Sequence, residues 1–491
     1  MRKFVSTRNK ENVVFSKEAI IQGLAKDGGL YTPVKLDDIK IDLDKCSDLN
    51  YQELATYILS EIFDDFTEKE IKTCVIKAYT DSFATDDVVL VSEIGEDFLL
   101  ELYHGPTSAF KDVALTILPH LLSTAYKTHA ENKKIYILTA TSGDTGKAAL
   151  EAFKNVKNIY ITVFYPKDGV SKIQERQMNT TKGNNVDVVS VRGNFDACQR
   201  LVKTIYEDRQ INEIYNNVQL SSANSINIGR LIPQVVYYFK AYLVLVKNKV
   251  IKLNEKVNFI VPTGNFGDIL AGYFAKLIGC PINKLVCAAN KNNVLVDFIN
   301  TGIYDINRKF YTTMSPSMDI LISSNLERLL FILSDFDDEK IKQYMSDLKI
   351  KGRYEIDKEM LSKLQESFVG IYVSEKKCSQ AIHRAFHRDK RLIDPHTAIA
   401  YHASSKYKDK HQNIILATAS PFKFPISVSD SITKADIKEE IEAMEKLAQI
   451  SREEIPLNLK DINKLEILHN KTIEIAEGRD YVIERMEKLN V

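Results

Sequence analysis

The chain has 491 residues, a length that favours about two to four domains. Hydrophobic residues make up 44% and charged residues 27%, which is typical of globular proteins. Lys plus Arg and Asp plus Glu both number 66, so the formal net charge is zero and the basic surplus of nucleic-acid-binding proteins is absent. The N-terminus lacks a continuous apolar segment, and the most apolar stretch, residues 231–246, is interrupted by Gln234 and Lys240. We therefore expect no secretory signal and no membrane-spanning helix. Six scattered cysteines without a CxxC pair favour reduced thiols in a cytoplasmic protein that binds no metal.

The first hundred residues are expected to form a mostly helical domain. Residues 16–28 and 51–63 carry apolar side chains at helical spacing, and strand signals are few. Two glycines and a proline in residues 27–33, DGGLYTP, predict a turn between elements.

Strands that alternate with helices begin near residue 134. The short β-rich apolar runs are residues 134–141, 158–166, 186–193, 256–262, 284–289 and 413–421. The first is followed by a small-residue turn and a helical pattern, and the run at 256–262 repeats that arrangement. An amphipathic helix is predicted at 195–208, with Phe195, Cys198 and Val202 on one face. This alternation favours an α/β fold with largely parallel sheets.

The C-terminal segment, residues 434–491, is charged, helical in pattern and poor in strand signals. Its clearest helix, residues 434–450, is expected to pack an apolar face on the core. Four parts are predicted for the whole chain: residues 1–100, 101–222, 223–430 and 431–491.

A first candidate anion site is the sequence TATSGDTGKAA. It resembles a nucleotide-binding P-loop but fails at two positions, because Thr141 replaces the first glycine and Ala148 follows Lys147. The turn still places Ser142–Thr145 at a predicted helix N-terminus, where free N–H groups and the helix dipole favour an anion. The anion could be a carboxylate or a phosphate, and a plain capped turn is the alternative.

A second candidate is the sequence PTGNFGDIL. Gly264 and Gly267 allow close approach of a ligand to the backbone, and Asn265 together with the following N–H groups could line an anion site. Asp268 is predicted to be the N-cap of the next helix, with its carboxylate turned away from any phosphate. A lone GxxG is a weak signal, so this turn matters mainly in combination with the first.

Lys111 lies in the apolar stretch HGPTSAFKDVAL. Desolvation lowers the pKa of an amine and makes it a nucleophile toward carbonyls. The alternative is a structural lysine paired with Asp112. A nucleophilic lysine, a phosphate site and a carboxylate site together describe a pyridoxal-phosphate enzyme that acts on an amino acid.

Seven blocks of the sequence resemble threonine synthases of the enterobacterial and fungal branch. They occur in family order over about the first 425 residues, whereas the C-terminal helical segment matches poorly. The blocks are QGLAKDGGLYTP, YHGPTSAFKDVAL, LTATSGDTGKAA, GNFDACQRLVK, SSANSINIGRLIPQ, VPTGNFGDILAGYFAK and ATASPFKFP. The resemblance implies a fold-type-II pyridoxal-phosphate enzyme, similar to the tryptophan synthase β-subunit. It also implies a lyase that converts O-phospho-L-homoserine and water into L-threonine and phosphate, the last step of threonine biosynthesis.

The resemblance also implies a role for individual residues. Lys111 would bind the cofactor covalently, and Thr418 would hydrogen-bond its pyridine nitrogen. The cofactor phosphate would lie on Gly264, Asn265, Phe266, Gly267 and Asp268. The substrate carboxylate would lie on Ser142, Asp144 and Thr145, and the substrate phosphate on Asn224, Ser225 and Arg230. Lys423 is a weaker candidate for the phosphate.

Some points stay open within the resemblance. Many fold-type-II enzymes have Asn where this chain has Asp144, so the contact of the cofactor's phenolic oxygen is not settled. No N-terminal extension of the plant kind that binds S-adenosylmethionine is recognised. A phospholyase that releases 2-oxobutyrate is an alternative with the same fold, and a non-catalytic cofactor-binding protein is another. The chain is expected to be a monomer or a homodimer with no nucleic-acid partner.

Overall fold

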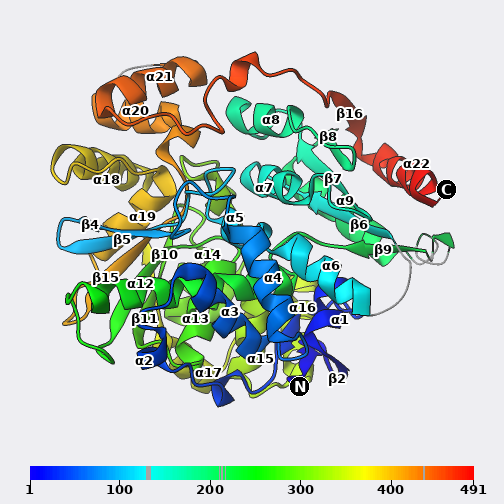
Figure 1. Cartoon of the computed structure of the whole chain (residues 1–491), viewed down its shortest axis with the longest axis horizontal. Helices are drawn as coiled ribbons and strands as arrows, with labels where there is room; N and C mark the ends of the chain where they lie inside the picture. The colour runs from blue at the N-terminus through cyan, green and yellow to red at the C-terminus, as the bar shows by residue number, and fades with distance from the viewer. Residues whose placement is uncertain (129–133, 209–210, 212–213, 216, 435–436, 491) are drawn as a thin grey trace.

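The computed structural model describes residues 1–128, 134–208, 211, 214–215, 217–434 and 437–490 (Figure 1). Two sheets, each covered by helices on both faces, make up most of this part of the chain. The predicted α/β class with parallel-rich sheets is confirmed. No helix in the described ranges is long and apolar enough to cross a membrane.

The large sheet has six strands in the order β14-β11-β10-β15-β5-β4. All neighbours are parallel except β4 and β5, which form an antiparallel pair. The strands are β4 Leu90–Ile94, β5 Asp97–Glu101, β10 Val257–Pro262, β11 Ile282–Ala289, β14 Phe368–Tyr372 and β15 Gln412–Ala417.

Both faces of the large sheet are buried. In β10, Phe259 and Val261 belong to the apolar cluster that includes buried residues of α13, whereas Ile260 between them belongs to the cluster that includes buried residues of α19. This arrangement explains why the strand reads as a continuous apolar run rather than an alternating one. The helices on this sheet are α12 Val235–Lys247, α13 Gly267–Leu277, α14 Val294–Thr301, α17 Lys358–Ser367, α18 Glu375–His387 and α19 Pro395–Ser404.

The small sheet has five strands in the order β16-β8-β7-β6-β9, all parallel. The strands are β6 Lys134–Ala140, β7 Ile159–Pro166, β8 Val186–Arg192, β9 Val218–Ser221 and β16 Lys471–Glu474. The helices around this sheet are α7 Asp144–Phe153, α8 Lys172–Asn179, α9 Phe195–Glu207 and α22 Gly478–Asn490. Strands β6, β7 and β8 and helices α7 and α9 were all predicted from the sequence and are confirmed.

The N-terminal part contains a small antiparallel sheet in the order β2-β1-β3. Its strands are β1 Phe4–Ser6, β2 Asn9–Val14 and β3 Tyr31–Pro33, and its helices are α1 Ser16–Gln22, α2 Leu43–Cys46, α3 Tyr51–Ile62 and α4 Glu68–Tyr79. Helices α1 and α3 were predicted, and the strands were not. Two of these strands have only three residues, which is too short to show a period of two.

Further helices pack around these layers. They are α5 Lys111–Leu115, α6 Leu118–Thr128, α11 Ile228–Leu231, α15 Leu326–Leu333, α16 Asp338–Lys351, α20 Pro425–Thr433 and α21 Glu440–Ser451. The strands β12 Ile303–Asp305 and β13 Arg353–Glu355 form a separate two-stranded antiparallel sheet. Helix α5 contacts α7 of the small sheet and α11, and Figure 1 shows it between the two sheets. All six cysteines are free and buried, and no group of three or more His, Cys, Asp or Glu side chains in the described residues could hold a metal ion.

Strand pairing joins segments that the three predicted borders separate. Strand β5 pairs with β15 of the large sheet, although the border was placed at residue 100. Strand β16 pairs with β8, so the C-terminal segment contains a strand as well as the predicted helix α21. The division at residues 100, 222 and 430 therefore stays a prediction.

Candidate active site

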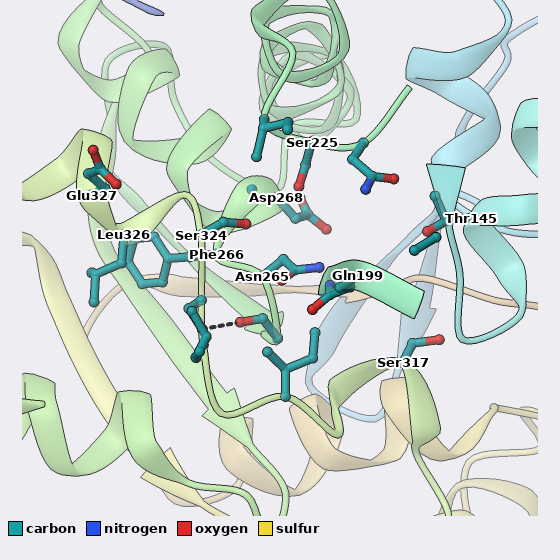
Figure 2. A pocket seen from close by; sticks show the side chains of 18 of the residues that line it. Thr145, Gln199, Ser225, Asn265, Phe266, Asp268, Ser317, Ser324, Leu326 and Glu327 are labelled. Atoms are coloured by element: carbon teal, nitrogen blue, oxygen red, sulfur yellow. Dashed lines mark hydrogen bonds between the residues drawn. The ribbon is translucent and has the colours of Figure 1, made fainter. Parts of the chain in front are cut away.

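A cavity of about 550 Å³ opens where strands of both sheets end. Its lining includes Ala140 at the end of β6, Pro262 at the end of β10 and Thr418 after β15. The carboxyl ends of parallel strands are the usual location of ligand sites in α/β folds. Every residue that the resemblance assigns to the site, apart from the weaker candidate Lys423, lines this cavity, and Figure 2 shows Thr145, Ser225, Asn265 and Asp268 around one space.

The turn before α13 presents a row of open backbone donors. Within the described chain, no acceptor meets the N–H groups of Asn265, Phe266, Gly267 and Asp268. Phe266 adopts a left-handed conformation with φ 63, which bends the backbone into the helix. A Cβ at Gly264 would lie 3.0 Å from the Ser317 carbonyl oxygen, so a side chain there would crowd the turn. The arrangement fits a phosphate.

Asp268 differs from its prediction. Phe266 holds the N-cap position, and Asp268 is the second residue of α13. Its Oδ1 accepts hydrogen bonds from the hydroxyls of Tyr237 at 2.5 Å and Tyr238 at 3.0 Å. Its Oδ2 is buried and has no partner among the described residues. Burial raises the pKa of Asp268 to about 6.

The turn before α7 is built in a similar way. Gly143 is the N-cap with φ 135, a conformation that side chains rarely adopt. The Thr141 hydroxyl accepts the N–H groups of Gly143 and Gly146, both at 2.9 Å. The N–H groups of Ser142, Asp144 and Thr145 meet no acceptor in the described part of the chain. The predicted helix N-terminus is confirmed, and its open donors suit an anion.

Lys111 is the first residue of α5 and lies between the two turns. The Phe110 N–H donates to the Thr418 carbonyl at 2.8 Å, which ties the start of α5 to the end of β15. Burial lowers the pKa of Lys111 to about 8, and its ammonium lies 3.8 Å from Asp144 Oδ2. Asp112, the alternative partner, instead accepts hydrogen bonds from the Thr107 N–H at 2.8 Å and hydroxyl at 2.6 Å.

Arg230 is a buried cation that lines the cavity. It is 6% exposed, and one guanidinium nitrogen donates to the Ala223 carbonyl at 2.7 Å. No carboxylate of the described residues pairs with it, and burial lowers its pKa to about 10. A buried charge is costly unless it is paired, so this position favours an anionic ligand. Asn224 and Ser225, predicted to act with it, line the same cavity.

Lys423 is not among the residues that line the cavity, and its role as a substrate-phosphate ligand stays a prediction. Its ammonium donates to Asp144 Oδ1 at 2.8 Å and to the Thr107 carbonyl at 2.9 Å, and its side chain is 0% exposed. Asp144 also accepts from Gln174 Nε2 at 2.9 Å. Burial by itself raises the pKa of Asp144, but the ammonium groups of Lys423 and Lys111 outweigh it and hold that pKa below its usual range.

Several residues that hydrogen-bond to the cavity lining were not predicted from the sequence. Arg328 is fully buried and donates to the carbonyl oxygens of Tyr31 at 2.9 Å and Ser225 at 3.3 Å. Asn325 Nδ2 donates to the Ser225 hydroxyl at 2.9 Å. His396 also lines the cavity, and its Nε2 accepts the Ser317 N–H at 3.1 Å. No local signal identifies these residues, because Arg328 lies within an apolar run that predicts only a packed helix.

The residues present fit pyridoxal phosphate. The turn before α13 supplies donors for the phosphate, and Lys111 supplies an amine of lowered pKa for the carbonyl carbon. The Thr418 hydroxyl lines the cavity and makes no hydrogen bond within the described chain, so it is available to a ring nitrogen. The open N–H groups of the turn before α7 remain after this assignment, and they suit a second anion.

Three family profiles match the chain. They are "Threonine synthase N terminus" at residues 3–79, "Pyridoxal-phosphate dependent enzyme" at residues 90–414 and "Threonine synthase, C-terminal" at residues 397–468. The last match corrects the expectation that the resemblance ends near residue 425. The match to the second profile establishes dependence on pyridoxal phosphate.

Individual relatives agree with these profiles. Threonine synthase of Saccharomyces cerevisiae is 37% identical over 462 residues, which cover 87% of this chain and 88% of that protein. Threonine synthase of Pseudomonas aeruginosa is 35% identical over 431 residues, 87% of this chain and 89% of that protein. Threonine synthase-like 1 of Homo sapiens is 38% identical over 461 residues, but these cover only 61% of its own length. This chain therefore spans less than two thirds of that relative.

Solved structures are similar over almost the whole chain. The structure of threonine synthase from Brucella melitensis with pyridoxal phosphate bound has a TM-score of 0.87 and 34% identity, and covers 99% of both chains. The yeast threonine synthase structure has the same TM-score of 0.87 with 33% identity. The similarity includes both sheets and the N-terminal and C-terminal parts of this chain.

Proposed function

Because this chain belongs to the threonine synthase family of fold-type-II pyridoxal-phosphate-dependent enzymes, we propose that it is itself a threonine synthase. The reaction would convert O-phospho-L-homoserine and water into L-threonine and phosphate. The observation that supports this most directly is Arg230, a buried guanidinium that faces the cavity without a carboxylate partner among the described residues. A phosphate ester supplies the dianion that such a group binds best, because the planar guanidinium matches two phosphate oxygens.

Pyridoxal phosphate, when bound, supplies an electron sink for negative charge that develops at the substrate's α-carbon. The N–H groups of Asn265–Asp268 would hold its phosphate. The Thr418 hydroxyl, a neutral donor, would hydrogen-bond its ring nitrogen without adding charge. The Lys111 amine would bind its carbonyl carbon.

Lys111 would also move the protons. A pKa of about 8 leaves part of the amine uncharged near neutral pH, so Nζ can take a proton from the substrate's α-carbon and later return it. One amine would serve two neighbouring carbons, which requires that the substrate be held at both ends. The open N–H groups of Ser142, Asp144 and Thr145 would hold the carboxylate, and Arg230 with Asn224 and Ser225 would hold the phosphate. The same three side chains would stabilise the phosphate as it leaves.

The test is to incubate the purified protein with pyridoxal phosphate and O-phospho-L-homoserine, and to quantify phosphate and the organic product in one tube. Equal amounts of phosphate and threonine are expected. Phosphate with 2-oxobutyrate would replace the proposal with a phospholyase, and cofactor binding without phosphate release would contradict both.

Arg230→Met tests the substrate-phosphate site in the same assay. We expect the KM for the phosphorylated substrate to rise about 10- to 100-fold, since charge-assisted hydrogen bonds are lost. Arg388→Met is the matched control, because Arg388 is 63% exposed and pairs with Asp389 on the surface. An unchanged KM in Arg230→Met would show that the substrate phosphate binds elsewhere.

A further inference from the structure

Lys423 is a buried cation beside the cavity, and it is not among the residues that line it. It ends the short 3-10 turn Pro421–Lys423, and its side chain is 0% exposed. Its two acceptors are Asp144 Oδ1 at 2.8 Å and the Thr107 carbonyl oxygen at 2.9 Å. Lys423 therefore affects the Lys111 amine through its own charge and through the carboxylate of Asp144, which lies between them.

Asp144 lies between two ammonium groups. Lys423 is 2.8 Å from Oδ1, and Lys111 is 3.8 Å from Oδ2. Gln174 Nε2 donates to Oδ1 at 2.9 Å and the Ser317 hydroxyl lies 3.4 Å from Oδ2, so the carboxylate is held from several sides. A single carboxylate balances only one positive charge, and the shorter contact assigns that charge to Lys423.

We propose that Lys423 is a positioning residue that occupies Asp144 in a fixed ion pair and so keeps this carboxylate from capturing the Lys111 amine. Without Lys423, the nearest counter-charge for Asp144 would be Lys111, and a tight ion pair would hold Lys111 protonated and turned away from a carbonyl carbon. With Lys423 in place, Lys111 keeps a weaker and longer contact. The inference rests on the proposed role of Lys111.

The other charged groups around Lys111 leave Asp144 as the carboxylate that is closest to pairing with its amine. Arg230 on α11 and Lys423 both disfavour the charged amine, whereas Asp144 on α7 and Asp112 on α5 favour it. Asp112 is engaged by Thr107, and Asp268 on α13 is engaged by two tyrosine hydroxyls. Asp144 is therefore the carboxylate whose pairing decides the state of Lys111, and Lys423 is its partner at hydrogen-bond distance.

The test measures the Lys111 amine itself. The full-length protein without cofactor is labelled with an amine-acylating reagent over a range of pH, and the label on the Lys111 peptide is quantified by mass spectrometry. Lys172, whose side chain is 76% exposed, serves as the internal reference in each sample. The midpoint pH of Lys111 labelling is compared among the native chain, Lys423→Met, Asp144→Asn and the double variant.

Opposite shifts are expected in the two single variants. Lys423→Met should raise the midpoint by about one pH unit or more, since Asp144 then pairs with Lys111 alone. Asp144→Asn should lower it, and the double variant should return close to the native value. A merely structural role for Lys423 predicts no rise in the single variant and no such reversal in the double variant.

Two controls address loss of a buried lysine and loss of the fold. Lys276→Met removes another lysine that is hydrogen-bonded inside the chain, to the Asn283 carbonyl and the Ser367 hydroxyl, and should leave the Lys111 midpoint unchanged. Lys423→Arg keeps the charge and should also stay near the native midpoint. If Lys423→Met does not fold, the proposal is judged on Asp144→Asn, the double variant and Lys423→Arg, and an unshifted midpoint in Asp144→Asn overturns it.

Borohydride reduction of the holoenzyme and peptide mapping separate this inference from the proposed function. Cofactor attached to a lysine other than Lys111 would overturn the proposed role of Lys111, while the labelling midpoints would still show whether Lys423 controls that amine. Cofactor on Lys111 with a native midpoint in Lys423→Met would overturn the inference alone.

Discussion

Two turns of similar construction line the cavity, one before α7 and one before α13. Each follows a buried parallel strand, leaves several backbone N–H groups open and places an aspartate in the first turn of its helix. The two aspartates nevertheless have opposite properties. Asp144 contacts two ammonium groups, which hold its pKa below the usual range, whereas Asp268 contacts two tyrosine hydroxyls and burial raises its pKa to about 6.

The difference shows that the local turn does not determine the charge state of its own carboxylate. Lys423 reaches Asp144 from the end of β15, and Tyr237 and Tyr238 reach Asp268 from α12. A charged aspartate fits the turn where an amine must be kept close. A carboxyl of raised pKa fits the turn proposed to hold the cofactor phosphate, where a second negative charge would repel it.

The largest difference is expected when each aspartate is removed. Asp144→Ala leaves Lys423 buried without a counter-charge and should lower the free energy of unfolding by about 3–5 kcal/mol. Asp268→Ala removes the acceptor of two tyrosine hydroxyls and should cost about 1–3 kcal/mol. Urea unfolding at pH 7 measures both. Equal losses would show that Asp144 and Lys423 do not form a buried charged pair.

Filling each turn with a methyl group should separate substrate binding from cofactor binding. In Gly143→Ala the new Cβ would lie 2.4 Å from the Gln174 amide at a φ of 135, so we expect the KM for the substrate to rise about tenfold. In Gly264→Ala the Cβ would meet the Ser317 carbonyl oxygen at 3.0 Å, and pyridoxal phosphate should bind several-fold more weakly. Steady-state kinetics at saturating cofactor measures the KM for the substrate, and equilibrium dialysis measures the dissociation constant of pyridoxal phosphate. A change of the same constant in both variants would contradict the assignment of the turns.

The smallest effect is expected in the pH dependence of cofactor binding. Since Asp268 loses its proton as the pH rises through about 6, the native chain should bind pyridoxal phosphate more weakly above that pH. Asp268→Asn keeps an acceptor for Tyr237 and Tyr238 without the charge, so its affinity should fall less over the same range. Dissociation constants between about pH 5 and pH 8 measure the difference. Parallel curves for the two proteins would show that Asp268 does not sense the bound phosphate.

Both turns were predictable from the sequence because the strand, the small residues and the helix follow each other directly. The site residues outside these turns were identified by the resemblance, and the fold brings them together around one cavity. The partners of the two aspartates were not predictable. Lys423 lies far from Asp144 in the sequence, Tyr237 and Tyr238 belong to the preceding helix, and their local patterns indicate only a turn or a packed helix.

The missed strands have a related cause. Strand β16 has four residues, two of them exposed, and lies among helical patterns. The residues of β4 and β5 were included in a helical domain, although their partner β15 lies in the large sheet. Short strands such as these form because a neighbouring strand pairs with them. When that neighbour lies far away in the sequence, the strand itself shows no clear alternation of apolar and polar residues.

The same two long-range pairings constrain how the protein is made. Strand β5 at residues 97–101 pairs with β15 at residues 412–417, and β8 at residues 186–192 pairs with β16 at residues 471–474. Neither sheet can be completed on the ribosome until most of the chain has emerged, and contacts this distant in sequence make folding slow. During synthesis, the edges of β5 and β8 stay open to other chains. We therefore expect the yield of folded protein to depend on chaperones that shield these edges until residues 412–474 arrive.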